Sequence, residues 1–195
     1  MKKITLILLC LILLSGCASS IVHMAEMETP PVLDIPSDNA TLVLIGETFT
    51  IGTMPGYKTY LDQKVIGAVR SGSYFLTSVE PGKHYVITEK NGYTCVTPFN
   101  FEPGKAYFIG QSTVPFFNKA ILGMDYRPSG LYPISLEDAN KVMKRYSFME
   151  YEPDPKQKDM DPQFYQQAIS EYLKYAKENP DAYKEILSYE GVIIR

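Results

Sequence analysis

Apolar residues in the middle of the chain come in short runs that are typical of β-strands. Residues 40–47 (ATLVLIGE) are apolar and about the length of one strand. Similar runs follow at 57–61, 64–70, 74–79, 84–90, 93–101 and 106–111. The segment 114–123 is apolar too and fits either a last strand or a packed loop. Turn signals recur between these runs, so the pattern predicts a mainly β fold, an antiparallel sandwich of about seven strands.

Two dipeptides between strands predict hairpins. Asn91-Gly92 is the strongest short hairpin signal in the chain, because both residues tolerate positive φ. Asp62-Gln63 lies between the runs 57–61 and 64–70 and predicts a second hairpin. Pro98 has no N–H to give to a strand partner, so the run that follows Asn91-Gly92 is expected at the edge of a sheet or with a bulge.

The register of the first hairpin tests whether a cysteine–histidine pair exists. A two-residue loop at 91–92 places Cys95 opposite Thr88 and His84 opposite Phe99. Cys95 and His84 then lie four positions apart on the ladder, or roughly 13 Å, which is beyond hydrogen-bond reach. We therefore expect Cys95 to be a small packing residue without a catalytic partner.

A four-residue sequence, Glu-Pro-Gly-Lys, occurs twice, 22 residues apart. Pro81 and Pro103 preset φ for the second position of a turn, and Gly82 and Gly104 supply the positive φ of a type II turn at the third. We interpret both copies as structural turns between strands rather than as a repeated ligand loop.

The C-terminal third changes to helical signals. Ser135 with Asp138 forms a variant capping box, which predicts a short helix over about 136–146. Residues 151–161 (YEPDPKQKDMD) are polar with two prolines, and the segment 147–161 is expected to be a linker.

A helical appendage is predicted over 162–195. Asp161-Pro162 is an N-cap followed by proline at the first helical position, and apolar residues follow at helical spacing. Asn179-Pro180 repeats the signal and predicts a shorter helix through about 188, with Gly191 as its C-cap glycine. This appendage either packs on the sandwich or forms an arm that binds an envelope protein partner.

The N-terminus has the organisation of a secretory signal. Lys2 and Lys3 precede an apolar run at 4–14, which is too short to span a hydrocarbon core of about 30 Å. The run ends in Leu14-Ser15-Gly16-Cys17, which resembles the lipobox of bacterial lipoproteins.

The resemblance implies how the mature protein is anchored. It implies diacylglycerol on the Cys17 sulfur, cleavage before Cys17 and acylation of the new amine, for instance with palmitate. Two or more chains make a stable membrane anchor. Ala18, rather than aspartate, implies sorting to the outer membrane, facing the periplasm, in a Gram-negative host.

These features divide the chain into five parts. We expect a cleaved signal peptide at 1–16, a lipidated tether at 17–38, the β-sandwich with its closing helix at 39–146, the linker at 147–161 and the helical appendage at 162–195. The proline- and serine-containing tether is expected to lift the domain several tens of Å off the membrane. Once Cys10 is removed and Cys17 is lipidated, Cys95 is left without a disulfide partner.

A second resemblance covers the strands. Residues 60–67 (YLDQKVIG), 72–75 (GSYF), 79–84 (VEPGKH) and 104–109 (GKAYFI) resemble a widespread bacterial lipoprotein domain of unknown function, which is similar to PEGA and transthyretin-like sandwiches. The resemblance implies this sandwich fold and lends no reaction. Asp62-Gln63 stands where that pattern prefers Asn-Gly, which leaves open a loop longer than two residues.

Composition and motifs argue against several function classes. The net charge of −3 and the pI near 5.5 do not suit a nucleic-acid binder. The common hydrolase, phosphate-binding and zinc motifs do not occur, and a chain with two histidines does not make a histidine-rich zinc site. A carboxylate pair could be drawn from four strand-end residues, but nothing in their spacing selects two of them: Glu47, Asp62, Glu80 and Glu89.

The sequence therefore predicts a membrane-anchored lipoprotein that is an envelope structural or protein-interaction module. We expect no catalytic residues, no cofactor and no metal. The alternative is a glycan- or peptidoglycan-binding module, since some of the 15 tyrosines could stack on sugars.

Overall fold

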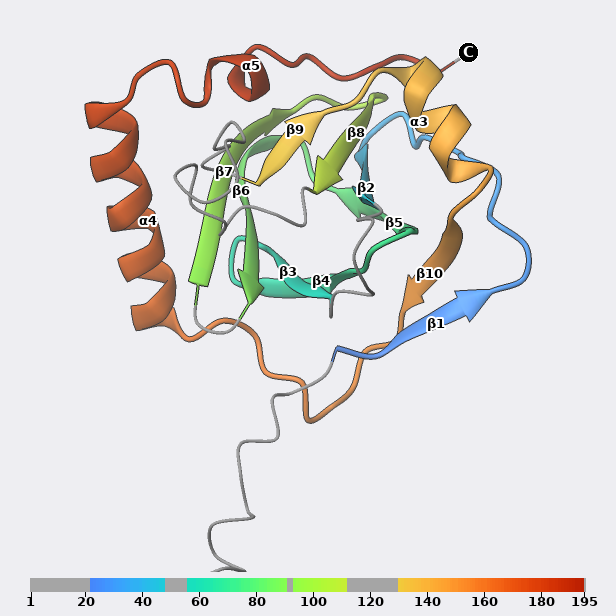
Figure 1. Ribbon diagram of the computed structural model, residues 1–195, viewed down its shortest axis with the longest axis horizontal. Helices are drawn as coiled ribbons and strands as arrows, with labels where there is room; N and C mark the ends of the chain where they lie inside the picture. The colour runs from blue at the N-terminus through green and yellow to red at the C-terminus, as the bar shows by residue number, and fades with distance from the viewer. Residues whose placement is uncertain (1–21, 48–55, 91–92, 112–129, 195) are drawn as a thin grey trace, which may run out of the picture.

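The computed structural model describes residues 22–47, 56–90, 93–111 and 130–194. These residues are mainly β, with 42% in strands and 20% in helices, and form two sheets with a C-terminal helix (Figure 1). The mainly β fold with a C-terminal helix is confirmed. The described strands number ten rather than about seven.

The larger sheet has six strands in the order β1-β10-β5-β2-β8-β9. Their bounds are β1 Met24–Met27, β2 Ala40–Gly46, β5 Ser73–Val79, β8 Ala106–Gln111, β9 Leu131–Pro133 and β10 Ser147–Tyr151. Two neighbouring pairs, β2–β8 and β10–β5, are parallel, and the other three are antiparallel. The expectation of a wholly antiparallel fold is therefore wrong for this sheet.

The smaller sheet has four strands in the order β4-β3-β6-β7, and all of its pairs are antiparallel. Their bounds are β3 Tyr57–Leu61, β4 Lys64–Val69, β6 Gly82–Lys90 and β7 Tyr93–Phe101. In the β6–β7 ladder Thr88 faces Cys95 and His84 faces Phe99, which confirms the predicted register. β7 is an edge strand, as Pro98 indicated.

The β3–β4 connection is a tight hairpin. Leu61 pairs with Lys64, so the loop has only the two residues Asp62 and Gln63, and a longer loop is excluded. Asp62 has φ 54°, in the left-handed region that aspartate tolerates better than most residues. The register shifts between Thr59–Gly67 and Tyr60–Val65, which leaves Ile66 as the extra residue of a bulge in β4.

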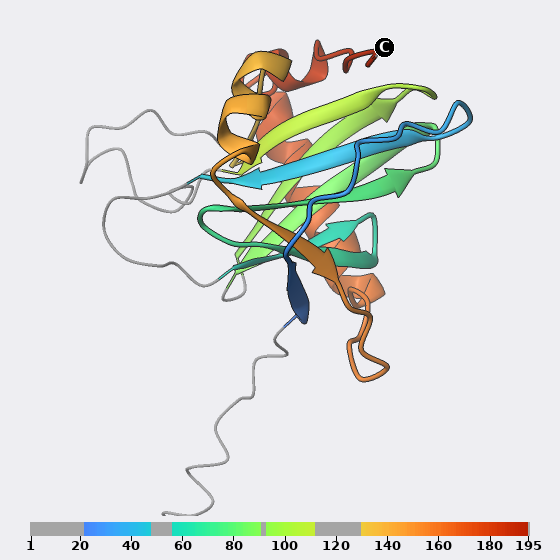
Figure 2. The same ribbon diagram turned by 90° about the vertical axis from the view of Figure 1, so that its right-hand side faces the viewer.

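Two apolar clusters cover the two faces of the large sheet. One contains Leu42 and Leu44 of β2 together with residues of the small sheet and of α4 (Pro162–Glu178). The other contains Val43 and Ile45 of the same strand, packed beneath α3 (Leu136–Met143). In Figure 1 the strands accordingly lie between α4 on one side and α3 on the other, and Figure 2 shows the strands side-on.

The predicted helix starts are present at two places. Ser135 Oγ accepts from the backbone N–H of Asp138 at 3.1 Å, and α3 ends at Met143 rather than near 146. Asp161 Oδ1 accepts from the N–H groups of Gln163 and Phe164 at 2.9 and 3.1 Å, with Pro162 at the first helical position of α4.

The second predicted helix start, Asn179-Pro180, does not begin a helix. Asn179 closes α4, because its side-chain amide and its backbone N–H both donate to the Tyr175 carbonyl. A turn follows, and α5 spans only Lys184–Leu187. Gly191 has φ 71° but lies beyond α5, where an added Cβ would come within 2.8 Å of the Tyr107 ring. It permits close packing and is not a helix C-cap.

Two segments expected to lack secondary structure contain strands. β1 lies within the predicted tether and β10 opens the predicted linker, and the two pair with each other from Met24–Tyr151 to Met27–Phe148. Val22 is buried, so the folded domain begins well before residue 39. Both strands are short and half polar, which is why neither stood out from its surroundings.

Gly82 and Gly104 have positive φ, at 130° and 70°. Only Gly104 matches the third position of a type II turn, while Gly82 already belongs to β6. The signal peptide, Cys17, Asn91, Gly92 and the segment 114–123 lie outside the described residues.

We expect Gly104→Val to lower the free energy of unfolding by about 1–2 kcal/mol, because a β-branched residue is strained at φ 70°. The nearest atom to an added Cβ is the Ser37 carbonyl oxygen at 4.0 Å, so strain rather than a clash causes the loss. Gly104→Asn is the matched control and should lose less. Urea unfolding measures both variants, and a valine variant as stable as wild type contradicts the turn.

Candidate functional site

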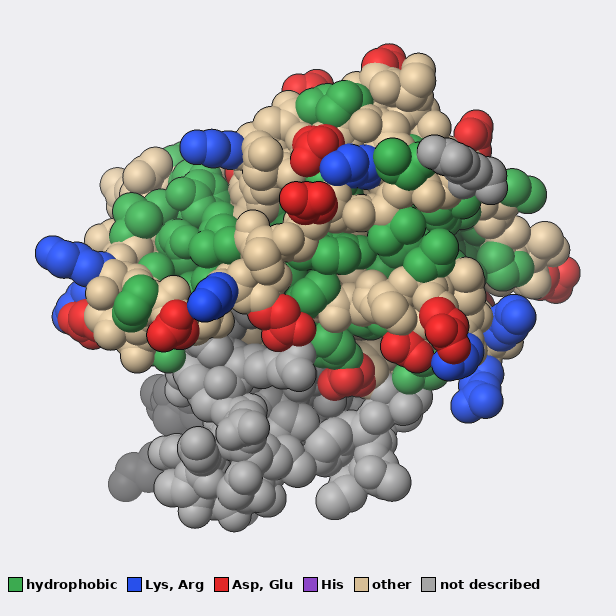
Figure 3. Space-filling view, turned by 90° about the horizontal axis from the view of Figure 1, so that it is seen from above, with side chains coloured by type: hydrophobic (Ala, Val, Ile, Leu, Met, Phe, Trp, Pro, Cys, Tyr) green, Lys and Arg blue, Asp and Glu red, His purple; other side chains and the backbone are tan. Residues whose placement is uncertain are grey.

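The end of the molecule that carries α5 is seen face-on in Figure 3. Hydrophobic side chains gather over much of this face, with acidic and basic groups scattered among them. Leu187, at the end of α5, is one of the exposed large hydrophobic residues of the described chain, with 57% of its surface accessible. A surface on which apolar side chains gather between charged groups is a candidate interaction site.

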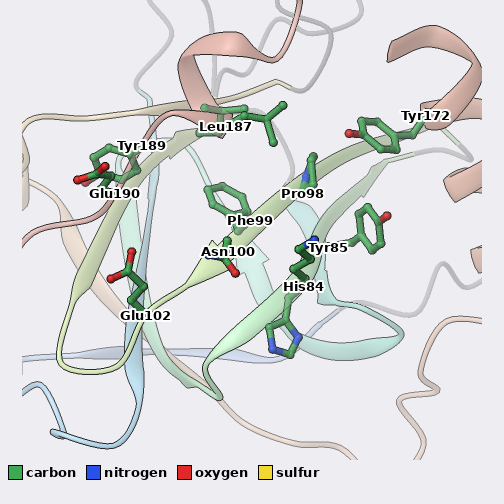
Figure 4. A pocket seen from close by; sticks show the side chains of 12 residues that line it. His84, Tyr85, Pro98, Phe99, Asn100, Glu102, Tyr172, Leu187, Tyr189 and Glu190 are labelled. Atoms are coloured by element: carbon green, nitrogen blue, oxygen red, sulfur yellow. The ribbon is translucent and has the colours of Figure 1, made fainter. Parts of the chain in front are cut away.

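A cavity of about 430 Å³ opens beside Leu187 (Figure 4). Its floor comes from the first part of β6 and the last part of β7, and its walls come from α4, α5 and the segment that follows α5. The residues that shape it most are Tyr85, Pro98, Phe99, Tyr172, Leu187 and Tyr189. The volume lies in the range of small-molecule and side-chain binding pockets.

Polar residues line the side of the cavity away from α4. Asn100 lies near the end of β7 and Glu102 just after it, and the C-terminal segment contributes Glu190. Glu102 pairs with Lys105 at 2.9 Å. Both Asn100 and Glu190 are exposed, so a carboxylate and an amide border an otherwise aromatic and aliphatic lining.

Tyr107 holds this side of the cavity together. Its hydroxyl donates to the Asn100 carbonyl at 3.2 Å and accepts from the Glu102 N–H at 2.9 Å, which closes the turn between β7 and β8. The Tyr107 ring meets Phe101 and Tyr189 edge to face. Burial raises the pKa of Tyr107 and of Tyr189, so both hydroxyls stay neutral and act as hydrogen-bonding groups.

Tyrosines also fasten α4 to the small sheet. Tyr172 contacts Tyr85 of β6 and Tyr183 of the turn before α5, and Tyr183 in turn meets Tyr175. Burial is the main reason that the pKa of Tyr172 is raised. These contacts make the four tyrosines packing residues, and Tyr172 also lines the cavity.

His84 lies at the border of the cavity and is paired with Asp62. Its Nδ1 is 2.8 Å from Asp62 Oδ2, and Asp62 Oδ1 accepts from the backbone N–H of Tyr85 at 2.9 Å. The Asp62 N–H donates to the Tyr85 carbonyl at 2.7 Å. This pair locks the β3–β4 turn onto β6 and fixes the imidazole ring.

The histidine–aspartate pair was not evident from the sequence. The two residues are 22 positions apart and meet only because β3 pairs with β6. Among the described residues, Asp62 is the one non-glycine residue with a positive φ. This feature is visible in the structure and not in the sequence.

The carboxylates considered for a hydrolytic pair have separate partners. Asp62 binds His84, Glu89 accepts from the Tyr60 hydroxyl at 3.0 Å, and Glu47 accepts from the Tyr132 hydroxyl. Glu80 is an exposed residue between β5 and β6. Across the described ranges, no cluster of three histidine, cysteine, aspartate or glutamate residues could hold a metal ion.

Cys95 is buried on β7 and faces Thr88, eleven residues along the chain from His84. Burial raises the pKa of its thiol to about 12. A hydrogen bond with the neighbouring Thr88 side chain acts in the opposite direction and is the smaller effect. The thiolate, which is the nucleophilic form, is therefore scarce at neutral pH.

Comparisons with known proteins add no assignment. The chain matches no protein-family model, and a search of curated proteins finds no significant match. Within the described part of the chain, no helix has both the length and the apolar character needed to cross a membrane.

We expect Cys95 to react with a thiol reagent on the order of 1000-fold more slowly in the folded protein than after denaturation, because each unit of raised pKa lowers the thiolate fraction about tenfold and burial raises this pKa from 9.0 to about 12. A chain that starts at Ala18 contains no other thiol. Labelling is followed by absorbance with and without denaturant. Rapid labelling of the folded chain with an acidic apparent pKa contradicts the buried thiol.

Proposed function

We propose that this protein is a lipid-anchored lipoprotein of the bacterial envelope whose domain binds a protein partner. The lipobox ending in Cys17 supports the anchor. The cavity between β7 and the C-terminal helices supports a binding role, and it is the observation on which this proposal mainly rests. In a Gram-negative host, Ala18 favours the inner leaflet of the outer membrane.

The lining of the cavity suits a protein partner better than a highly charged ligand. Aromatic and aliphatic side chains form most of it, and Leu187 stands exposed at its edge. Protein interfaces combine such an apolar centre with a polar rim, which Asn100 and Glu190 would supply here. A side chain or short segment of a partner fits the volume.

The proposal includes the family to which the domain belongs, a PEGA or transthyretin-like sandwich. Two sheets that share an apolar cluster are compatible with a sandwich of the PEGA or transthyretin-like type, which the motifs at 60–67 and 79–84 resemble. The parallel β2–β8 pair is the feature to compare with members of those families.

A glycan- or peptidoglycan-binding module is the second candidate. It is favoured by one observation, the placement of Tyr172 and Tyr189 near Asn100 and Glu190 in one cavity. Aromatic rings can stack on the apolar face of a sugar, while carboxylate and amide groups bind its hydroxyls. This candidate predicts sedimentation of the protein with purified peptidoglycan.

We expect Cys17→Ala to leave the precursor uncleaved and without lipid, because the thiol is the acceptor of diacylglycerol. Mass spectrometry of the N-terminal peptide measures both effects. Ala18→Asp is the control, since it should keep the lipid and change only the membrane to which the protein is sorted in a Gram-negative host. A wild-type N-terminal peptide without added lipid mass contradicts the anchor.

A photoreactive phenylalanine analogue at position 187 should crosslink to a partner protein in native envelopes, because Leu187 borders the cavity. Leu173 of α4 is the matched control: it is 55% exposed against 57% for Leu187 and does not line the cavity. Gel shifts and mass spectrometry identify the product. Equal crosslinking at both positions contradicts a site at the cavity, and cosedimentation with peptidoglycan without a protein crosslink favours the second candidate.

A further inference from the structure

The folded domain begins very close to the predicted lipid attachment point. Val22 is 4% exposed, and Met24 Sδ lies 3.3 Å from the Ala68 nitrogen inside the core. The His23 carbonyl accepts from the Glu152 N–H at 3.1 Å, and β1 then pairs with β10. The chain is therefore fixed to the domain from residue 22 onwards.

Only five peptide units separate Cys17 from Val22. At full extension they span about 18 Å at most. A lipidated Cys17 sits at the level of the acyl-chain attachment, and the headgroup layer above it takes about 5–8 Å of that length. Val22 is then held within about 10–13 Å of the headgroup surface.

We propose that the β1 edge of the domain and the loop 152–160 lie against the bilayer surface, an inference that rests on the proposed lipid anchor. It replaces the expectation of a long tether that lifts the domain. The loop belongs to this edge because it leaves β10 at Tyr151, the strand partner of Met24, and because Asp154 lies 3.7 Å from the His23 ring.

The chemistry of this edge suits contact with headgroups rather than insertion. The exposed loop residues carry mixed charges: Glu152, Lys156, Lys158 and Asp159. Such a surface is not the polybasic patch that binds anionic lipid on its own. The short connection to the anchor, and not affinity for lipid, holds the edge against the bilayer.

The α5 wall of the cavity lies at the end of the domain opposite β1. β1 and β9 are the two edges of the six-stranded sheet, five strand spacings or about 24 Å apart. α5, which lines the cavity, contacts β9 and β7. Figures 1 and 2 both show β1 low in the molecule and α5 high. The α5 side of the cavity, with the exposed Leu187, consequently faces away from the bilayer, toward partners in the space beyond it.

Energy transfer from the protein to the membrane tests this orientation. The full-length lipidated protein, with Cys95→Ala, is reconstituted into vesicles of phosphatidylethanolamine and phosphatidylglycerol that carry an acceptor dye on their headgroups. A donor dye is attached to Lys156→Cys in the loop or to Lys184→Cys on α5. Both positions are exposed lysines, so they form a matched pair. We expect several-fold more transfer from position 156.

A lengthened tether is the control. A 20-residue glycine–serine segment inserted after Ser20 gives a connection with an average span of about 25–30 Å, which should remove most of the difference between the two positions. Equal transfer, or more transfer from position 184, in a protein whose lipid mass is confirmed overturns the orientation and leaves the anchor standing. A protein without lipid that does not associate with vesicles overturns both the anchor and the orientation.

Discussion

Strand β2 imposes the constraint on which the other layers depend. All seven of its residues are buried, so its apolar side chains need cover on both faces of the sheet. The small sheet covers one face, and α3 with flanking chain covers the other. Its parallel neighbour β8 adds a second constraint, because parallel strands cannot be joined by a hairpin. The chain between them instead builds β5 and the whole small sheet.

The requirement for cover explains why both ends of the described chain return to the large sheet. Leu33 and Ile35 pack on the outer cluster, and so do Val192 and Ile194 from the far end of the chain. Val192 also exchanges backbone hydrogen bonds with Ala106, at 2.8 and 2.7 Å. The last residues therefore complete a face of the sheet, which places α5 and Tyr189 across the end of the domain.

The sequence predicted the features of this fold that depend on a few neighbouring residues, such as turns and helix starts. The β6–β7 register follows from a two-residue loop, and the start of α4 follows from Asp161 with Pro162. Pairings between distant segments were not predictable in this way. β1 and β10 lie more than 100 residues apart, and neither has an apolar run of its own to mark it. The cavity was missed for the same reason, since β7, α4 and α5 meet only in the folded chain.

The way in which the edge strands are protected explains where the cavity lies. An open edge invites pairing with another chain, and short strands, prolines and covering helices prevent this. β1 and β9 are short edges, while β7 carries Pro98 and is covered by α4 and α5. The cover over β7 is incomplete near Pro98 and Phe99, and the cavity occupies that gap. The β7 edge is thus the edge at which aromatic packing stops short, so the helices that protect it from pairing with another chain also leave a gap that a ligand or partner can enter.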